Sequence, residues 1–324
     1  MSESSEKKII CSLISHKLGC SPFDYTLKLK LTSECEYSSK LRCCTFQRNI
    51  HDNSYESDRL LAVGDFSGNL TVWDIDRLGL PLFQSGQQKH GGAINAIDSY
   101  QHSVATGGKD GKAILWDVRA MKMQHSFDYQ PSSSTTAAAA DVAQKKECAA
   151  WSIYTDDLYL FVGYESGDLS CFDLRTSKLL TTYHSSDTIK TSVSSIAINS
   201  QRDYNNIILG GSESKPLSFV KFNNNNNSNN NSIVEQSSNS DSQQPTLKSK
   251  LAWCTRYSPF SKSMFAVTTS EGSLSLYNGR DTLIDSIKLS EYPVLSVDFN
   301  GSKEGLMATV SLNRKLNILF TPFK

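Results

Sequence analysis

The Gly-rich stretch Gly107-Gly-Lys-Asp-Gly-Lys112 has the residue types of a phosphate site, because backbone N–H groups and a lysine can cradle phosphate oxygens. Its spacing differs from that of a P-loop, and Ala113 follows where a P-loop has Ser or Thr. The stretch also lies between two apolar runs, with no helical pattern after it. Glycines that permit positive φ in a tight turn account for the composition. The sequence therefore predicts a turn here and no phosphate site.

Residues for nucleophilic or metal-assisted catalysis do not converge elsewhere in the sequence. It contains no G-x-S-x-G elbow and no H-E-x-x-H motif. The six histidines are scattered, and the eight cysteines form no C-x-x-C pair. We interpret the cysteines as small buried hydrophobes in a reducing compartment. The sequence thus predicts no catalytic residues, no metal site and no cofactor.

Four residues around the Gly-rich turn nevertheless form an ordered set: His90, Thr106, Asp110 and Trp116. Their types, order and spacing resemble the hydrogen-bonded tetrad that braces one blade in proteins of the WD-repeat family. The resemblance implies a structural role, in which His90 donates within the network of Thr106, Asp110 and Trp116. A catalytic role for His90 would need a nucleophile close by, and the sequence offers none.

The elements that would position this set recur along the chain. Each copy is an apolar run, a turn and a second apolar run that ends in an aromatic residue, which reads as a β-hairpin. An apolar strand precedes each hairpin and a fourth strand follows most of them. The clearest copies repeat after roughly 40–45 residues, the period of propeller blades. The six hairpins are Leu60–Asp74, Val104–Asp117, Leu160–Asp173, Ile207–Phe222, Phe265–Asn278 and Leu306–Phe320.

Four short strands per repeat predict an all-β WD-repeat β-propeller that forms a single domain over residues 1–324. We expect Ile9–Leu13 to complete the last blade and Tyr25–Leu31 to belong to an incomplete first blade. Seven blades with a degenerate first blade are favoured, and six blades are the alternative. Two low-complexity segments, 131–146 and the Asn-rich 223–247, are too polar to bury a core and are predicted to be disordered loop insertions.

Composition narrows the function classes. The chain of 324 residues has 33 Lys and Arg against 33 Asp and Glu, whereas nucleic-acid binders carry a basic surplus. No apolar run approaches the roughly 18 residues that a membrane span needs. The polar N-terminus is unlike a signal peptide. We therefore expect a cytoplasmic protein that binds neither nucleic acid nor membrane.

A propeller acts through its loops and its two ends, so the hairpin turns and channel-mouth residues are the candidate contacts. Trp151 and Trp253 lie early in two inner strands, and Trp and Arg are favoured interface anchors. Packing against a neighbouring blade is the alternative for the tryptophans, and ordinary solvation is the alternative for the turns. The candidate partner-binding residues are Trp151, Trp253, Arg256, Asp65, Phe66, Lys109 and Arg314.

Two segments suggest a second kind of partner. Trp116-Asp-Val-Arg119 and Phe172-Asp-Leu-Arg175 resemble the W-D-x-R box by which some WD-repeat proteins dock on a cullin-RING ubiquitin ligase adaptor. This resemblance implies that Arg119 and Arg175 would contact the adaptor. The alternative function is therefore a substrate receptor of such a ligase.

Longer segments, among them Leu61–Asp74, Ile94–Asp98 and Val162–Arg175, are similar to the axonemal-dynein assembly factors within the WD-repeat family. This resemblance implies a non-catalytic cytoplasmic co-chaperone scaffold. It further implies protein partners, namely RuvB-like AAA+ ATPases with a TPR adaptor and dynein heavy chains. The chain would act as a monomer within that larger complex.

Overall fold

A computed structural model describes residues 10–13, 39–47, 60–74, 77, 80–130, 148–184, 192–199, 203–211, 216–224, 231–236, 251–280, 282–301 and 303–321. These residues form strands and turns in two compact units. The N-terminal unit holds the described residues of 32–196 and 220–235, and the C-terminal unit holds those of 1–31, 197–219 and 236–324. The single domain over the whole chain stays a prediction. In the described part of the chain, no helix has the length and apolarity of a membrane span.

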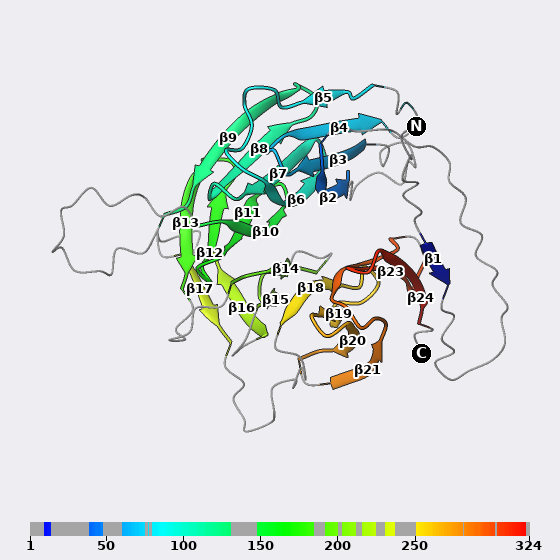
Figure 1. Cartoon of the computed structure of the whole chain (residues 1–324). Helices are drawn as coiled ribbons and strands as arrows, with labels where there is room; N and C mark the ends of the chain where they lie inside the picture. Colours follow the sequence, from blue (N-terminus) through cyan, green and yellow to red (C-terminus); the bar gives the residue numbers. More distant parts are fainter. Residues whose placement is uncertain are drawn as a thin grey trace, which may run out of the picture. The chain divides into compact units, whose positions relative to one another are not determined.

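Three four-stranded antiparallel sheets lie in the N-terminal unit, each with its strands in chain order (Figure 1). The first is β2 (Leu41–Phe46), β3 (Leu60–Asp65), β4 (Leu70–Asp74) and β5 (Phe83–Gln84). The second is β6 (Ile94–Tyr100), β7 (Ser103–Gly108), β8 (Lys112–Asp117) and β9 (Lys122–Asp128). The third is β10 (Ala150–Thr155), β11 (Tyr159–Tyr164), β12 (Leu169–Asp173) and β13 (Lys178–Tyr183).

The three sheets bury their faces against one another, with β6 in contact with both β2 and β10. Strands β3, β7 and β11 are almost wholly buried, as expected for apolar runs covered on both faces. One core cluster joins the first and second sheets through Val72, Ile94 and Trp116. Another joins the second and third through Leu115, Phe127 and Phe172. Each sheet needs its neighbour to cover it, which is the packing logic of stacked repeats.

The hairpin turns share one geometry, which fixes where their side chains lie. In each sheet the N–H of the first turn residue donates to a carbonyl beside the start of the inner strand. The three pairs are Phe66 to Lys40 (3.0 Å), Lys109 to Ala93 (2.8 Å) and Glu165 to Ala149 (2.9 Å). The turn tips therefore gather at the starting ends of β2, β6 and β10.

The C-terminal unit contains two complete sheets. One is β18 (Ala252–Tyr257), β19 (Met264–Thr269), β20 (Ser273–Asn278) and β21 (Thr282–Lys288). The other has the order β1-β24-β23-β22, from β1 (Ile10–Leu13), β22 (Val294–Phe299), β23 (Leu306–Ser311) and β24 (Lys315–Phe320). A shared cluster that includes Leu276, Val294, Val297 and Met307 packs them together.

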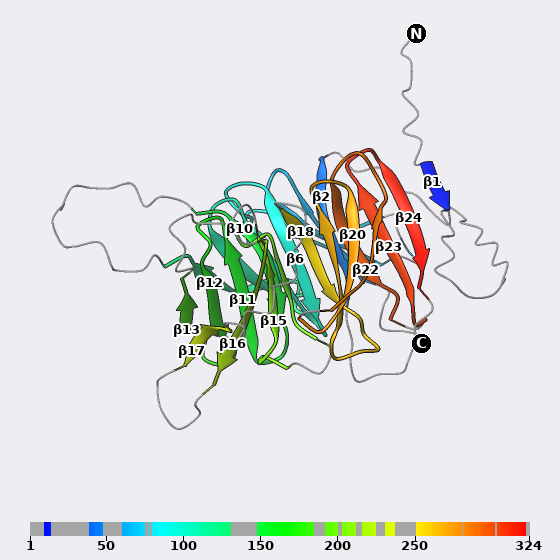
Figure 2. The same cartoon turned by 90° about the horizontal axis from the view of Figure 1, so that it is seen from below.

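Strand β1 lies on the outer edge of the last sheet, beside β24 and parallel to it (Figure 2). Its pairing runs from Ile10 opposite Lys315 to Leu13 opposite Ile318. The expectation that Ile9–Leu13 completes the last blade is therefore confirmed for Ile10–Leu13. Tyr25–Leu31 lies outside the described residues, so a degenerate seventh blade stays a prediction.

The sixth described sheet has the order β14-β15-β16-β17, from β14 (Ser195–Ala197), β15 (Ile207–Gly210), β16 (Leu217–Asn223) and β17 (Ser232–Glu235). Strand β17 lies inside the segment 223–247, which was expected to be a disordered loop. The structure differs there because Ile233 supplies a buried side chain and pairs opposite Phe222. The other predicted loop, 131–146, lies outside the described residues.

Candidate functional site

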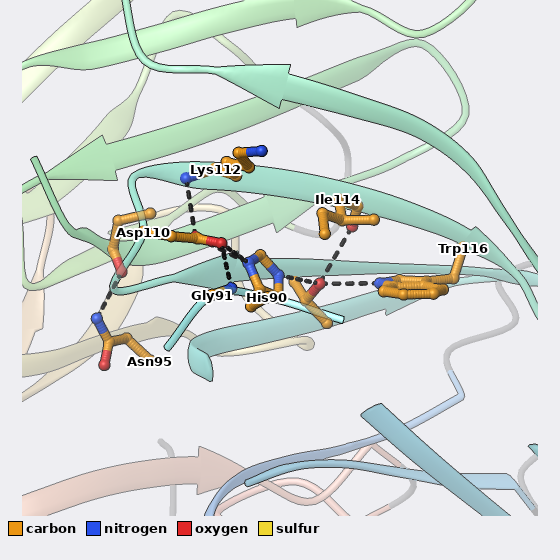
Figure 3. Close-up of polar contacts among 9 residues, drawn as sticks. His90, Gly91, Asn95, Asp110, Lys112, Ile114 and Trp116 are labelled. Carbon is orange, nitrogen blue, oxygen red and sulfur yellow. Dashed lines mark hydrogen bonds and ion pairs between the residues drawn. The ribbon is translucent and has the colours of Figure 1, made fainter. Parts of the chain in front are cut away.

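The structure brings His90, Thr106, Asp110 and Trp116 together in the second sheet (Figure 3). Strands β7 and β8 supply Thr106 and Trp116, the turn between them supplies Asp110, and the loop before β6 supplies His90. The Trp116 Nε1–H donates to Thr106 Oγ1 at 2.9 Å. His90 Nε2 lies 2.9 Å from the same oxygen, and His90 Nδ1 lies 2.9 Å from Asp110 Oδ1.

The hydrogen-bond roles in this set follow from which atoms carry protons. Because a carboxylate only accepts, His90 Nδ1–H donates to Asp110. The Thr106 oxygen accepts from Trp116, and its one hydroxyl proton has two acceptors in reach, His90 Nε2 at 2.9 Å and the Ile114 carbonyl at 3.3 Å. The hydroxyl donates to Nε2 when that nitrogen has no proton, and to Ile114 when Nε2–H donates to Thr106. Every polar atom of the set is thereby paired, as buried polar groups must be. Gly108 makes room for it, since a Cβ there would overlap His90 Nδ1 and Asp110 Oδ1.

Asp110 also anchors the turn. Its Oδ2 accepts from the Gly91 N–H at 2.8 Å and its Oδ1 from the Lys112 N–H at 3.2 Å. Burial favours a raised pKa for this carboxyl group, but the hydrogen bond and charge of His90 and the two N–H donors outweigh it. The pKa of Asp110 is therefore lowered from its ordinary value of 3.8.

The set has no room to act on a substrate. His90, Thr106 and Trp116 are each at most 1% exposed, and every nitrogen of His90 is engaged. Across the residues that the structure describes, His, Cys, Asp and Glu form no cluster that could hold a metal. This geometry ties the loop before β6 to the hairpin and braces the sheet.

The predicted contact residues of the N-terminal unit lie in unlike environments. Asp65 is only 1% exposed, and its Oδ1 accepts from the N–H groups of Ser67 and Asn69, both at 2.8 Å. The Asp65 carboxylate therefore stabilises the β3–β4 turn. Phe66 and Lys109 are exposed at turn tips, and Trp151 is half-buried.

Arg42, which the sequence did not single out, lies among these candidate contact residues. Its guanidinium lies 5.3 Å from the ring centroid of Phe66 and 5.3 Å from that of Trp151. Arg42 and Trp151 are the bulged residues of their inner strands, at the same register in β2 and β10. Alignment of the inner strands would have placed Arg42 at the position of Trp151.

In the C-terminal unit, Trp253 is the bulged residue of β18 and so repeats the position of Trp151. Trp253 and Arg256 are both half-buried. Arg314 is exposed in the β23–β24 turn, with a φ of 64°. Glycines with positive φ, such as Gly272, fill this turn position in other sheets. An Arg there carries backbone strain of about 1 kcal/mol.

Arg119 and Arg175 lie at the ends of β8 and β12, in turns anchored by the preceding aspartates. Asp117 Oδ1 accepts from the Arg119 N–H at 2.9 Å, and Asp173 Oδ1 accepts from the Arg175 N–H at 2.8 Å. Both arginine side chains are exposed, although the Arg175 guanidinium also bonds to Asp173 at 3.3 Å. The aspartates thus have a structural role in both segments.

Repeated four-stranded sheets with a buried His–Thr–Asp–Trp set define a WD-repeat β-propeller protein. Residues 83–266 match the family model described as Nucleolar protein 10-like, N-terminal domain. Dynein axonemal assembly factor 10 of Dictyostelium discoideum is 30% identical over 91% of this chain and 80% of its own length. The human protein of that name is 24% identical over 90% of this chain and 82% of its own. The chain belongs to the Nucleolar protein 10-like propeller family and to the family of dynein axonemal assembly factor 10.

Solved structures support the fold. A chain in the crystal structure of the mitotic checkpoint complex superposes with a TM-score of 0.65 at 15% identity, covering 90% of this chain and 77% of its own. The structure of U3-55K gives a TM-score of 0.60 at 10% identity, covering 88% of this chain and 83% of its own. The all-β propeller fold predicted from the repeats is confirmed, with six four-stranded sheets among the described residues.

Proposed function

We propose that the protein is a non-catalytic cytoplasmic scaffold, a co-chaperone adaptor in the assembly of axonemal dynein or another multisubunit complex. The observation that carries the proposal is the 30% identity over 91% of the chain with a dynein axonemal assembly factor. Such coverage extends the likeness well beyond the generic features of one blade. An assembly factor works by holding other polypeptides, so its partners are proteins.

The distribution of polar and aromatic residues supports this role. The residues most suited to chemistry, His90 and Asp110, are committed to bracing one sheet. The exposed residues at the turn tips include Phe66 and Lys109, next to Arg42 and Trp151 at the inner strands. Arg and aromatic side chains are the types that anchor protein interfaces.

The proposed partners are RuvB-like AAA+ ATPases with a TPR adaptor, and dynein heavy chains as clients. Affinity purification of the tagged full chain, followed by mass spectrometry, tests this. The expected result is enrichment of the ATPases or the TPR adaptor over an unrelated tagged propeller. Recovery of neither would remove the co-chaperone role. Sizing of the purified chain should give a monomer.

The alternative is a substrate receptor of a cullin-RING ubiquitin ligase. It draws support from the exposure of Arg119 and Arg175 after the equivalent strands β8 and β12 of the second and third sheets. The test is binding of the ligase adaptor to the full chain and to the Arg119→Ala, Arg175→Ala double variant. This function requires binding that the double variant loses. Absence of binding by the unaltered chain would exclude it.

A further inference from the structure

Arg42 lies against Phe66 and Trp151 at one end of the N-terminal unit, and Leu41 precedes it in β2. Phe66 is 50% exposed and Leu41 is 51% exposed. Trp151 lies on the Arg42 guanidinium, at the same 5.3 Å from ring centroid as Phe66. Adjacent exposed apolar side chains beside an arginine are typical of a binding surface. We call Leu41, Arg42, Phe66 and Trp151 the Arg42 surface.

The Arg42 surface joins the starting ends of the inner strands β2 and β10, and the inner strand β6 contacts both of them. Arg42 of β2 reaches Trp151 of β10, and Asn95 Nδ2 of β6 donates to the Ala150 carbonyl of β10 at 3.1 Å. These contacts hold the three strand starts together. The turn tips that follow β3, β7 and β11 gather at the same end, as their hydrogen bonds to the inner strands require.

The charge at this end is basic. Among the described residues, exposed Lys40, Lys89, Lys109 and Lys112 join Arg42 at this end, against the exposed acids Asp128 and Glu165. Asp65, Asp110 and Asp168 belong to the same turns, but hydrogen bonds within the sheets engage their carboxylates. The turn end of the N-terminal unit thus presents positive charge around the apolar side chains.

Two donors of the Arg42 surface have no acceptor or carboxylate partner among the described residues. Among the described residues, no carboxylate lies within ion-pair distance of Arg42, whose planar guanidinium is shaped for a carboxylate. The Trp151 Nε1–H is buried, and the described part of the chain gives it no acceptor. A buried donor without an acceptor costs stability unless something else supplies one.

We propose that the Arg42 surface binds an acidic segment of a partner polypeptide, with a carboxylate on Arg42 and an apolar side chain between Phe66 and Leu41. The lysines around it attract the acidic residues that flank the contact. The inference deepens the scaffold role proposed above by naming the chemistry of one partner. It is tested on the purified chain, independently of which complex the chain joins.

The probe is a short fluorescent peptide in which Asp and Glu residues flank a Phe-Leu pair, and its polarisation is measured with the full chain. We expect saturable binding that weakens as salt screens the charges. Arg42→Ala should weaken binding about tenfold, as for an interface anchor. Phe66→Ala, which changes an exposed side chain, should weaken it by a smaller factor.

Arg77→Ala is the matched control, because Arg77 is an exposed arginine of the same unit that follows the opposite end of the first hairpin. It should bind the probe as the unaltered chain does. Equal effects of Arg42→Ala and Arg77→Ala would overturn the proposal, as would equal binding of a probe with Lys for the acids. A probe with Ala for Phe-Leu that bound equally well would overturn the apolar contact. If Arg42→Ala does not fold, Phe66→Ala and the altered probes decide.

The failure of the proposal is distinct from the failure of the scaffold role. If Arg42→Ala loses probe binding but co-purifies the same proteins as the unaltered chain, the Arg42 surface is a binding site for a partner other than those proteins. Binding of no acidic probe, with assembly partners still recovered, would remove this surface and keep the scaffold.

Discussion

The second and third sheets of the N-terminal unit are neighbours, yet they stabilise the same hairpin by different means. In β6–β9 a hydrogen-bond chain runs from Trp116 through Thr106 and His90 to Asp110. In β10–β13 the positions of Thr106 and Trp116 are taken by Val162 and Phe172, both buried. The third sheet therefore has no such polar chain through its hairpin.

One position separates the two arrangements. Gly108 pairs opposite Ile94 at the start of the inner strand, and Tyr164 pairs opposite Ala150 at the same point of the next sheet. The missing side chain of Gly108 leaves the space that His90 fills. Tyr164 is instead fully buried, and its ring lies 4.6 Å from that of Tyr129. At this position the third sheet has a buried tyrosine ring, where the second sheet has the space for the His90 ring.

The third sheet has a polar set of its own, which lies nearer the surface than that of the second sheet. Asp168 accepts hydrogen bonds from Ser166 Oγ at 2.8 Å and from the Tyr129 hydroxyl, and His184 Nδ1 lies 2.8 Å from its Oδ1. The side chain of His184 is 41% exposed, whereas that of His90 is 0% exposed. In both sheets an aspartate in or beside the hairpin turn accepts several hydrogen bonds, although the donor side chains differ. The comparison indicates that stabilising the turn matters more to a blade than the identity of the side chains that do so.

Gly108→Ala should have the largest effect, because it closes the space that the comparison identifies. The new Cβ would overlap His90 and Asp110, so the buried chain would have to break. We expect a loss of about 3 kcal/mol in the free energy of unfolding, from overpacking and from broken buried hydrogen bonds. Denaturant unfolding of the full chain measures it. Gly301→Ala is the control, since no atom of the described residues lies within 4 Å of its Cβ position.

Asp110→Asn should cost about 2 kcal/mol at neutral pH, since hydrogen bonds to a charged acceptor are the strong ones. The two Asp110 carboxylate oxygens now accept from His90, Gly91 and Lys112, and in the Asn variant an NH₂ group would replace one of these oxygens. Asp168→Asn should cost less, because the partner His184 is partly in water. Equal costs for the two variants would show that the buried and outward sets are energetically alike.

The same aspartates set a pH dependence. Burial opposes ionisation of Asp168, but hydrogen bonds from Tyr129, His184 and Ser166 outweigh it, so its pKa, like that of Asp110, is lowered from 3.8. A carboxyl group with a lowered folded-state pKa contributes stability above its unfolded pKa and loses it as pH falls through the folded value. Stability should therefore decline below about pH 4. Each Asn variant should flatten that decline, which unfolding curves at several acidic pH values can measure.

The comparison also explains which parts of the structure could be predicted from the sequence. The hairpins and the edge strand near Ile10 follow from local patterns of apolar residues, turns and aromatic ends, and the tetrad residues follow from the resemblance to the WD-repeat family. The Tyr129, Ser166, Asp168 and His184 set does not, because its members come from separate elements that only packing brings together. Arg42 was missed for a related reason. Its partners Phe66 and Trp151 lie in another strand connection and another sheet.

Trp116→Phe sharpens the comparison by converting one tetrad position to the residue that the third sheet has at Phe172. The ring still fills the core, but Thr106 Oγ1 loses the donor that lies 2.9 Å away. We expect a loss of about 1 kcal/mol, the net worth of one buried hydrogen bond. The full-chain unfolding midpoint measures it. An unchanged midpoint would mean that the chain from Trp116 to Asp110 adds nothing beyond packing.

Tyr164→Phe removes one polar atom from a buried aromatic residue, as Trp116→Phe does, but the sign should differ. Among the described residues, the Tyr164 hydroxyl has no hydrogen-bond partner, and burial raises its pKa well above the ordinary value. Deleting a buried, unpaired hydroxyl removes a desolvation penalty without breaking a bond, so stability should stay unchanged or rise by up to about 1 kcal/mol. Unfolding curves of the two variants, measured side by side, give the contrast. A loss for Tyr164→Phe as large as that for Trp116→Phe would mean that the hydroxyl is paired, and the third sheet would then also depend on a buried polar contact.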